Sequence, residues 1–355
     1  MRVHLVDPAA YTPPYDRALA SALARAGAEV SLITSAFTYG DVPDAPGVDV
    51  IEAFYRWAPA RGRRFARLAQ HGPDMLRYRI RPAHPADVVH FQWLPVQQVD
   101  GWLLPRRHPR LLTAHDVLPR EPKPGQLKAQ RRLYERMDAV VVHSEHGAAR
   151  LRDELGLDPA LVHVIRHGTL TGLDVPGEAP FAVPDRPVVL MFGLLRPYKG
   201  VDVLLEAWER ANVDAELWIV GMPRMDVTAV HGRNVRTALR FVSAGELAGA
   251  FRAASLVVLP YREIDQSGVL FTALAFGKPM LLTNVGGFPE VAATGAAAIV
   301  APGDPDALAT ELEALLGDPA RLERMAAASR AAAEGEYGWD DIAQRTLALY
   351  ASLRR

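Results

Sequence analysis

The feature that most constrains the fold of this chain is a series of short apolar runs that contain almost no polar residues. Val140–Val142, Val188–Phe192 and Leu256–Leu259 are examples, and each leads into a turn and then an amphipathic stretch. Strands of this kind are buried on both faces, which indicates a parallel sheet with helices on either side. The sequence therefore predicts an α/β fold of the doubly wound type.

The apolar runs fall into two series, separated by a loop rich in glycine, proline and acidic residues at Gly172–Pro187. The first series predicts a helix over Arg17–Arg25 and strands over Val3–Val6, Val30–Ile33, Val88–Phe91, Leu111–Thr113 and Val140–Val142. The second predicts helices over Val201–Ala211, Leu247–Ala253 and Ser267–Ala275, and strands over Val188–Phe192, Leu217–Val220, Leu256–Leu259, Pro279–Leu282 and Ala297–Val300. We expect two Rossmann-like domains, over residues 1–170 and 171–338.

Composition excludes several classes of protein. The 355 residues are 49% hydrophobic and 23% charged, which is typical of two soluble domains. A net charge of -1 argues against a nucleic-acid partner, and the lack of cysteine excludes disulfides and thiolate metal sites. The amino terminus lacks the pattern of a signal peptide, and no apolar run reaches the roughly 18 residues of a membrane helix. We expect a cytoplasmic protein.

The loop after the strand Val188–Phe192 carries residues suited to a diphosphate. Ligands of doubly wound sheets bind outside the carboxyl ends of the strands. Gly193 allows the backbone to approach an anion closely, while Arg196 and Lys199 supply positive charge. Only four of the 40 basic residues are lysines, so a lysine here is informative. The alternative interpretation is a surface turn with incidental basic residues.

A second loop, after the strand Leu256–Leu259, is expected at the same edge of the same sheet. It ends in Gln266–Ser267–Gly268, where a predicted helix begins. Unpaired backbone N–H groups at a helix start can bind a phosphate or a sugar hydroxyl. Glu263 and Asp265 could accept hydrogen bonds from ribose or sugar hydroxyls. The alternative is that these carboxylates only stabilise the start of the helix.

Longer segments around these loops resemble glycosyltransferase family 4. FGLLRPYKGVDVLLEAW resembles the Gly-Arg…Lys-Gly phosphate motif of the family, and ALAFGKPMLLTNVGGFPE resembles its EAMACGKPVVASNVGGxPE block. The amino-terminal half is similar more loosely, through DVVHFQW, LLTAHDVLP and VVVHSE. The resemblance covers nearly the whole chain. It implies a GT-B fold, with two Rossmann-like domains facing a cleft and a terminal helix, residues 339–355, packed back on the first domain.

The resemblance also implies roles for particular residues. His115, Arg196 and Lys199 are expected to be catalytic, and the acceptor side is expected at Pro14, Tyr15 and Asp116. The expected donor-binding residues are Gly193, Arg196, Lys199, Phe241, Val242, Glu263, Asp265, Gln266, Ser267, Gly268, Val269 and Thr272. Neither a metal nor a cofactor is implied.

Three departures from the family pattern concern these residues. Leu194 occupies the position of the phosphate-binding arginine of the family, so we expect Arg196 to substitute for it. Thr272 stands where the family has the second of two glutamates, and Asp265 or Glu263 is expected to take the role of the first. The glycine pair after the first strand is replaced by Pro13–Pro14–Tyr15, which points to an unusual acceptor or donor geometry.

The histidines of the first half have two interpretations each. His115 follows a predicted strand, where it could hydrogen-bond a sugar hydroxyl and stabilise charge at the reacting centre. A histidine that simply packs at the sheet edge is the alternative. His163 and His167 have a spacing seen in metal sites, but Val164–Ile165 between them is strand-like, which disfavours a helical ligand pair.

Arg56–Arg81 is a basic segment with eight arginines and one acidic residue, Asp74. Aromatic and apolar residues, including Trp57 and Phe65, are interleaved with the arginines. One interpretation is a surface for an anionic acceptor or for anionic lipid at the inner face of the membrane. The other is a solvated helix pair that covers the first sheet, with arginine stems packed on apolar surface.

The function that these features predict is a retaining hexosyltransferase. It would transfer a hexose from a nucleotide-diphosphate sugar, a UDP- or GDP-sugar, to a hydroxyl of a glycan, a glycolipid or a small metabolite. The alternatives are a catalytically silent protein that binds nucleotide sugars, which Thr272 motivates, and another enzyme of this fold such as an epimerase.

Overall fold

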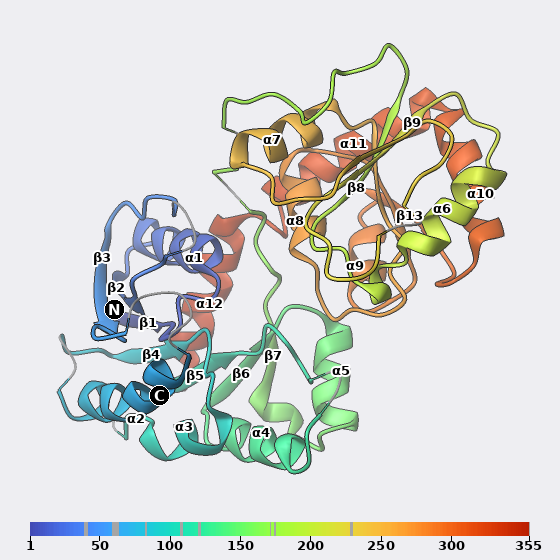
Figure 1. Cartoon of the computed structure of the whole chain (residues 1–355). Helices are drawn as coiled ribbons and strands as arrows, with labels where there is room; N and C mark the ends of the chain where they lie inside the picture. Colours follow the sequence, from blue (N-terminus) through green and yellow to red (C-terminus); the bar gives the residue numbers. More distant parts are fainter. Residues whose placement is uncertain are drawn as a thin grey trace. The chain divides into compact units, whose positions relative to one another are not determined.

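The computed structural model describes residues 1–38, 42–58, 64–81, 84–106, 109–119, 122–170, 172–173, 175–227 and 230–354, without the side chain of residue 64. The chain divides into two compact units (Figure 1). The N-terminal unit comprises Met1–Gly168 together with Trp339–Arg355, and the C-terminal unit comprises Thr169–Gly338. The division falls within two residues of the boundary expected from the sequence.

The N-terminal unit is built on a seven-stranded parallel sheet with the strand order β3-β2-β1-β4-β5-β6-β7. The strands are β1 (Arg2–Val6), β2 (Glu29–Ser35), β3 (Val48–Phe54), β4 (Val88–Phe91), β5 (Arg110–Thr113), β6 (Ala139–Val142) and β7 (Val162–Val164). All residues of β4 and β6 are buried, as expected of strands that are covered on both faces. The order reverses between β1 and β4, which makes their carboxyl ends the place where this sheet can bind a ligand.

Helices cover both faces of this sheet. They are α1 (Pro13–Arg25), α2 (Arg64–Ile80), α3 (Gln97–Leu103), α4 (Gln126–Tyr134), α5 (Glu145–Asp153), the 3-10 helix η1 (Pro159–Leu161) and α12 (Trp339–Leu353). One hydrophobic core packs α1 and α12 against one face, and a second core packs α2, α4 and α5 against the other. Helix α12 lies against α1, so the end of the chain belongs to the N-terminal unit.

The C-terminal unit repeats this plan with a six-stranded parallel sheet in the order β10-β9-β8-β11-β12-β13. The strands are β8 (Val188–Phe192), β9 (Glu216–Val220), β10 (Val235–Ala238), β11 (Leu256–Leu259), β12 (Met280–Thr283) and β13 (Ala297–Val300). The helices are the 3-10 helix η2 (Pro197–Lys199), α6 (Val201–Arg210), α7 (Ala244–Ala253), α8 (Gly268–Ala275), α9 (Phe288–Ala292), α10 (Pro305–Leu316) and α11 (Pro319–Glu334). Here the order reverses between β8 and β11.

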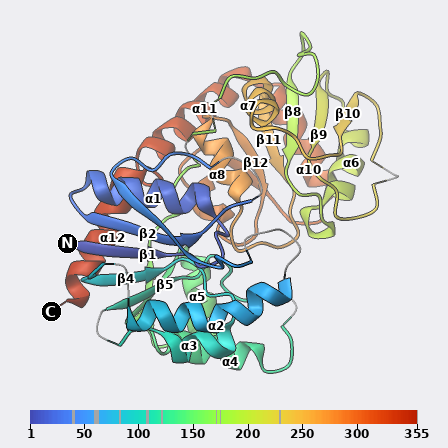
Figure 2. The same cartoon turned by 60° about the vertical axis from the view of Figure 1, so that its left-hand side comes forward.

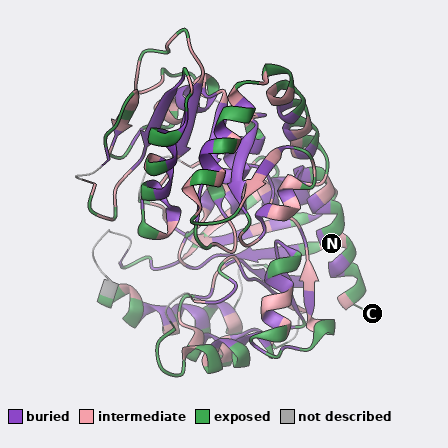
Figure 3. Cartoon of the chain, turned by 90° about the vertical axis from the view of Figure 1, so that its right-hand side faces the viewer, coloured by how far each residue is buried: buried purple, intermediate pink, exposed green. Residues whose placement is uncertain are grey.

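These two sheets confirm the predicted α/β fold with two doubly wound domains. Figure 3 shows the strands mostly buried and the outer faces of the helices exposed. Two strands that the sequence did not indicate, β3 and β10, lie at sheet edges, as does β7, of which only Val164–Ile165 was expected to be strand-like. Both β3 and β10 contain exposed polar residues, so neither produces a continuous apolar run. Of the helices that the structure describes, none has the length and apolarity that crossing a bilayer requires.

The segment Arg56–Arg81 differs from the expected helix pair. Its described part forms one helix, α2, which continues through Pro73. Arg61 and Arg63 lie outside the described residues, and nothing is known of the side chain of Arg64.

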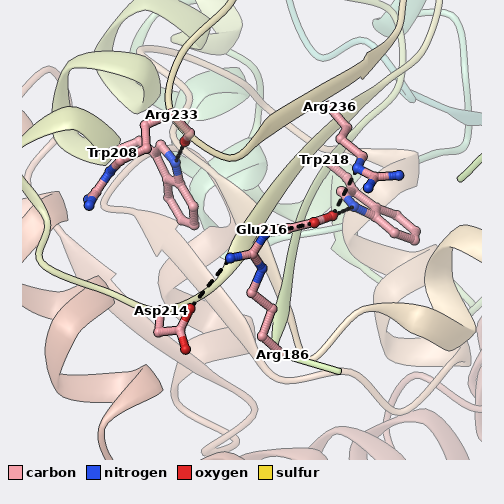
Figure 4. A network of polar contacts seen from close by, with 7 residues as sticks. All are labelled: Arg186, Trp208, Asp214, Glu216, Trp218, Arg233 and Arg236. Atoms are coloured by element: carbon pink, nitrogen blue, oxygen red, sulfur yellow. Dashed lines mark hydrogen bonds and ion pairs between the residues drawn. The ribbon is translucent and has the colours of Figure 1, made fainter. Parts of the chain in front are cut away.

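Glu216 begins β9, at the amino-terminal end of the sheet and away from the edge where ligands bind (Figure 4). Its carboxylate accepts hydrogen bonds from Trp218 Nε1 at 3.1 Å and from Arg186 Nη2 at 3.1 Å, and Arg236 Nε lies 3.2 Å away. Burial raises the pKa of Glu216, but these hydrogen bonds and charges outweigh it and hold the pKa below its usual value. The network joins three separate segments at the base of the sheet.

We expect Glu216→Ala to lower the free energy of unfolding by about 2 kcal/mol at neutral pH, because the buried Trp218 N–H and two arginines lose their acceptor. Since the folded pKa is depressed, the contribution is fully present above the unfolded pKa and is lost as pH falls through the folded pKa. Urea denaturation of wild type and variant at pH 7 and near pH 3 measures both effects. Glu209→Ala, at an exposed position of α6, is the matched control. Equal stabilities of wild type and Glu216→Ala at pH 7 would contradict the assignment.

Candidate functional site

Two loops of the C-terminal unit meet where its strand order reverses. One follows β8 and the other follows β11, and these strands are neighbours in the sheet. Gly193, at the end of β8, has a φ of 114°, and a Cβ there would lie 3.2 Å from Lys199 Nζ and 3.0 Å from Val269 Cγ2. Two of the predicted donor-binding residues are therefore packed directly against the Gly193 backbone. A side chain at position 193 would displace them.

Lys199 is the buried cation of this site, with 6% of its surface exposed. Its Nζ donates a hydrogen bond to the hydroxyl of the buried Tyr261 at 2.9 Å. The Tyr261 hydroxyl in turn lies 3.4 Å from Ser267 Oγ, immediately before α8. An ammonium group is expensive to bury, so its position beside an exposed helix start is suited to an anionic ligand.

Arg262, in the loop after β11, forms hydrogen bonds that hold this loop against the loop after β8. Its guanidinium binds Asp202 in α6 through two hydrogen bonds, of 2.8 and 2.6 Å, and its Nη1 also donates to Pro197 O at 3.0 Å. The hydrogen bonds from Arg262 lower the pKa of Asp202 and so keep it ionised. The backbones also touch, because a Cβ on Gly200, whose φ is 68°, would lie only 2.0 Å from Pro260 O.

The second predicted cation, Arg196, differs from Lys199 in its surroundings. Arg196 is exposed at the start of η2, close in sequence to the exposed Leu194. The loop thus presents one buried and one exposed cation.

The remaining predicted residues of the second loop lie around the start of α8. Glu263 is exposed, Asp265 is partly buried, and Gly268 is the exposed first residue of the helix. The buried Gln266 Oε1 has no hydrogen-bond partner among the described residues, so it is available to accept from a ligand. Thr272 is buried and its hydroxyl donates to Gly268 O at 2.9 Å. That bond occupies the donor of Thr272, so its predicted contact with ribose stays a prediction.

Phe241 and Val242, which were predicted to lie near a nucleobase, follow β10. The Phe241 ring is 72% exposed, whereas Val242 is buried. Arg240 Nη1 donates to Phe241 O at 3.1 Å, and Ser243 caps α7 through a capping box with Glu246. The segment is therefore held in place by its own side chains, with an aromatic face open to solvent.

In the N-terminal unit, His115 lies in a cluster of rings at the carboxyl ends of β5 and β6. Trp93 stacks on His115 at 5.0 Å between centroids, and Tyr15 meets it edge-on at 4.8 Å. His143 and His167 complete the cluster, with centroids 5.1 Å apart. The sequence did not predict that these three histidines come together.

The hydrogen bonds of this cluster fix the position of each proton. His143 Nδ1 donates to Ile165 O at 2.9 Å, so the Nε2 of a neutral His143 must be an acceptor. His115 Nδ1, 3.2 Å away, therefore carries a proton and donates it, which leaves His115 Nε2 with a lone pair. Gln92 presents its amide 3.2 Å from that nitrogen. We assign the amide nitrogen to this contact, which also gives the buried Gln92 Nε2 a partner.

Burial makes these imidazoles neutral. It lowers the pKa of His143 to about 4, and lowers the pKa values of His115 and His167 well below the usual value. A protonated His143 would lower the pKa of His115 further. His90 has a separate, structural role, since it bridges Thr113 Oγ1 at 2.8 Å and the Tyr350 hydroxyl of α12 at 2.7 Å.

The three predicted acceptor-side residues differ in how far they are exposed to solvent. Asp116 is exposed, Pro14 is partly exposed in the first turn of α1, and Tyr15 is buried against the histidine rings. The Tyr15 ring thus packs edge-on against His115. Its contact with an acceptor stays a prediction.

A pair of buried carboxylates, Asp7 and Asp16, lies beside Tyr15 and was not recognised from the sequence. Asp7 accepts hydrogen bonds from the backbone N–H groups of Ala9 and Tyr11, at 3.0 and 2.5 Å, and so ties down the loop between β1 and α1. Burial and the charge of Asp7 raise the pKa of Asp16 well above its usual value. This pair occupies the region where the family has its glycine pair.

No group of three or more histidine or carboxylate side chains within the described ranges is arranged to hold a metal ion. His163 lies in β7, so the pair His163 and His167 is not helical. The expectation that no metal is required stays a prediction.

The sequence and the structure were compared with those of known proteins. The family described as Glycosyltransferase Family 4 matches residues 17–171, and the family described as Glycosyl transferases group 1 matches residues 186–318. A D-inositol 3-phosphate glycosyltransferase of Xylanimonas cellulosilytica is 30% identical over an alignment of 382 residues. The alignment covers 94% of this chain and 89% of that protein.

Solved structures agree in fold. The sucrose-phosphate synthase of Thermosynechococcus elongatus superposes with a TM-score of 0.77 at 21% identity, over 99% of both chains. HepE of Anabaena, solved with UDP and glucose, gives a TM-score of 0.75 at 18% identity, over 99% of this chain and 100% of that one. Both are GT-B glycosyltransferases, and this chain has two parallel sheets and superposes on each, so its fold is GT-B. Its site, its fold and its relatives lead to one conclusion: this chain belongs to glycosyltransferase family 4 and is an enzyme that transfers a sugar.

Proposed function

We propose that this enzyme transfers a hexose, with retention of configuration, from a UDP- or GDP-sugar to a hydroxyl group of a glycan, a glycolipid or a small metabolite. The observation that carries the proposal is the buried Lys199 ammonium beside the Gly193 backbone, at the reversal of strand order. A diphosphate is the chemical group that such a fixed cation and close backbone are suited to hold. The relatives support a nucleotide sugar, since one is named as GDP-mannose-dependent and HepE was solved with UDP-glucose.

The proposed chemistry needs charge stabilisation more than it needs a dedicated base. The bond between the anomeric carbon and the diphosphate oxygen breaks, and the acceptor oxygen forms a new bond on the same face of the sugar. The leaving phosphate oxygen takes the acceptor proton. Lys199 and Arg196 stabilise the negative charge that develops on the diphosphate. In this proposal, neither a metal nor a cofactor takes part.

The other contacts to the donor follow from the placement of the second loop. The free Gln266 Oε1 accepts from a sugar hydroxyl, while the N–H groups at the start of α8 face a phosphate or hydroxyl oxygen. Asp265 or Glu263 accepts from ribose, in place of the first glutamate of the family. The nucleobase lies beside Phe241, whose exposed ring offers a surface for stacking.

His115 is proposed to contact the donor sugar from the N-terminal unit. Its Nε2 carries a lone pair because His143 accepts its Nδ1 proton. The Gln92 amide donates to that lone pair in the structure, so a sugar hydroxyl would replace the amide as the donor to Nε2. His143 acts as a positioning residue in this account. The cytoplasmic location expected from the sequence belongs to the same proposal.

A thermal-shift screen with UDP-, GDP-, ADP- and TDP-sugars tests the proposal and identifies the base. One class of donor should raise the melting temperature, because a ligand that binds only the folded state stabilises it. The same donor should be hydrolysed slowly in the absence of an acceptor. Binding without hydrolysis or transfer would support a silent binding protein, and inversion at C2 of the sugar would support an epimerase.

Lys199→Ala is expected to reduce kcat/KM for the donor by about a hundredfold or more, since removing one stabilising group at developing charge costs about 3–4 kcal/mol. Steady-state kinetics with the donor found in the screen measure this. Lys123→Ala, which removes an exposed lysine of the N-terminal unit, is the control and should match the wild type. Near-normal kinetics of Lys199→Ala would overturn the phosphate assignment.

Arg262→Lys should lower kcat about tenfold while the protein stays folded, because lysine cannot replace a bidentate bond to Asp202 and the second loop loses its alignment. Arg330→Lys is the matched control, since Arg330 pairs with Glu323 on α11, away from both loops. Kinetics and melting temperature are compared for all three proteins. A fall in melting temperature with unchanged kcat would mean that Arg262 has a structural role only.

The pH profile of kcat/KM should be flat between about pH 6 and pH 8. The pKa of His115 is lowered by burial, so the imidazole stays neutral over this range and protonates only in more acidic solution. Rates measured across this range, with the protein confirmed to be folded, provide the test. A break near pH 6.5 that disappears in His115→Gln would show that His115 titrates normally and would contradict the account.

A further inference from the structure

The helix α2 presents its apolar face to solvent. Phe65, Leu68, Leu76 and Ile80 are exposed to 86%, 57%, 44% and 65%. At the 3.6-residue period of an α-helix, these positions fall on one side, and Ala69 and Pro73, also exposed, lie between them. We call this side of α2 the apolar stripe. Surface helices normally turn such a stripe towards the core, so its exposure calls for a partner.

Buried polar contacts hold the helix in this orientation. Asp74 accepts from the Tyr55 backbone N–H at 2.7 Å, and His71 connects the Tyr55 hydroxyl at 2.7 Å with the Asp100 carboxylate at 2.5 Å. Gln70 accepts from the Trp57 backbone N–H at 3.3 Å. Turning the apolar stripe inward would break these bonds and bury unpaired polar groups. The exposure of the stripe is therefore built into the packing.

The neighbouring helices carry further exposed apolar side chains. Helix α2 packs against α3, and α3 packs against α4, as Figures 1 and 2 both show. Val99 and Trp102 of α3 and Leu127 of α4 are exposed, as is Trp57 just before α2. Of the 12 large hydrophobic residues that are exposed among the described residues, eight lie in this part of the chain. We call the exposed side of α2, α3 and α4 the helical face.

The helical face is also positively charged. The sequences of the three helices contain seven basic residues and two acidic ones, and both acidic side chains, Asp74 and Asp100, are buried. Glu135, directly after α4, pairs with Arg131, which leaves an excess of basic side chains. A groove of about 320 Å³ runs between α3 and α4, lined by Lys128, Arg132 and Arg136 together with Trp102. No carboxylate is among the residues that line it. The Arg136 guanidinium lies 3.8 Å above the Trp102 ring.

From these observations we infer that the helical face docks on an anionic lipid bilayer. The apolar stripe and Trp102 enter the boundary between headgroups and acyl chains, and the groove between α3 and α4 receives a lipid phosphate. A second copy of the chain is a poor occupant, because two cationic faces would repel each other. This inference goes beyond the proposed function and does not depend on it, since binding to lipid requires no sugar transfer.

Vesicle flotation of the full chain tests the inference. Vesicles of phosphatidylcholine alone are compared with vesicles that contain about one third phosphatidylglycerol, at low salt and at about 0.5 M salt. The wild type should float with the anionic vesicles, at least about tenfold more than with the neutral ones, and high salt should weaken this binding. Failure to float with anionic vesicles at low salt would overturn the inference.

Two double variants separate the apolar and the charged contributions. Phe65→Ser with Ile80→Ser should lose about tenfold or more of the binding, and Lys128→Glu with Arg132→Glu should lose the difference between anionic and neutral vesicles. Val183→Ser, at an exposed apolar position of the C-terminal unit, is the control and should bind as the wild type does. Circular dichroism confirms that each variant is folded. Undiminished binding by either double variant would overturn the inference, as would a wild-type dimer in sedimentation that Phe65→Ser with Ile80→Ser makes monomeric.

Discussion

A buried ammonium group needs compensation, and the compensation that Lys199 receives organises the C-terminal unit. The Tyr261 hydroxyl accepts one of its hydrogen bonds and in turn lies close to Ser267, so one cation connects the loop after β8 with the start of α8. Two glycines make this geometry sterically allowed. A Cβ on Gly200 would collide with Pro260 O in the other loop, and a Cβ on Gly193 would crowd Lys199 Nζ. Arg262 and Asp202 then fasten the outer sides of the loops. A diphosphate is the group that this fixed cation and the close Gly193 backbone are suited to hold.

In the N-terminal unit, burial keeps histidine side chains uncharged. Where the C-terminal unit buries the lysine side chain of Lys199, the cluster around His115 keeps three imidazoles neutral. The Ile165 carbonyl sets the tautomer of His143, and His143 sets that of His115, so a backbone group determines which His115 nitrogen has a lone pair. Tyr15 packs beneath these rings and connects them to α1, where the buried pair Asp7 and Asp16 shapes the adjacent loop. The enzyme thus has basic residues in its donor site and, in the N-terminal unit, a neutral histidine whose tautomer is set by its hydrogen bonds.

The sequence predicted the parts of this structure that depend on local pattern. Continuous apolar runs located β8 and β11 to the residue, and the strand-to-loop position of Gly193 and Lys199 was enough to place them at the carboxyl edge. Arg262 and Asp202 were not predicted, because they are 60 residues apart and a sequence with many arginines and acids does not reveal which of them pair. The stripe on α2 was missed for another reason. Periodicity shows that a helix has two faces, but only the contacts of His71 and Asp74 show which face points inward.

The account depends on where a nucleoside diphosphate binds. A crystal structure of the full chain with UDP or GDP, whichever the screen selects, tests this directly. We expect the β-phosphate within hydrogen-bond distance of Lys199 Nζ and of the backbone at Gly193, with Arg196 moved onto the same phosphate and the base beside Phe241. A nucleotide bound elsewhere, or a diphosphate that contacts neither Lys199 nor either loop, would contradict it.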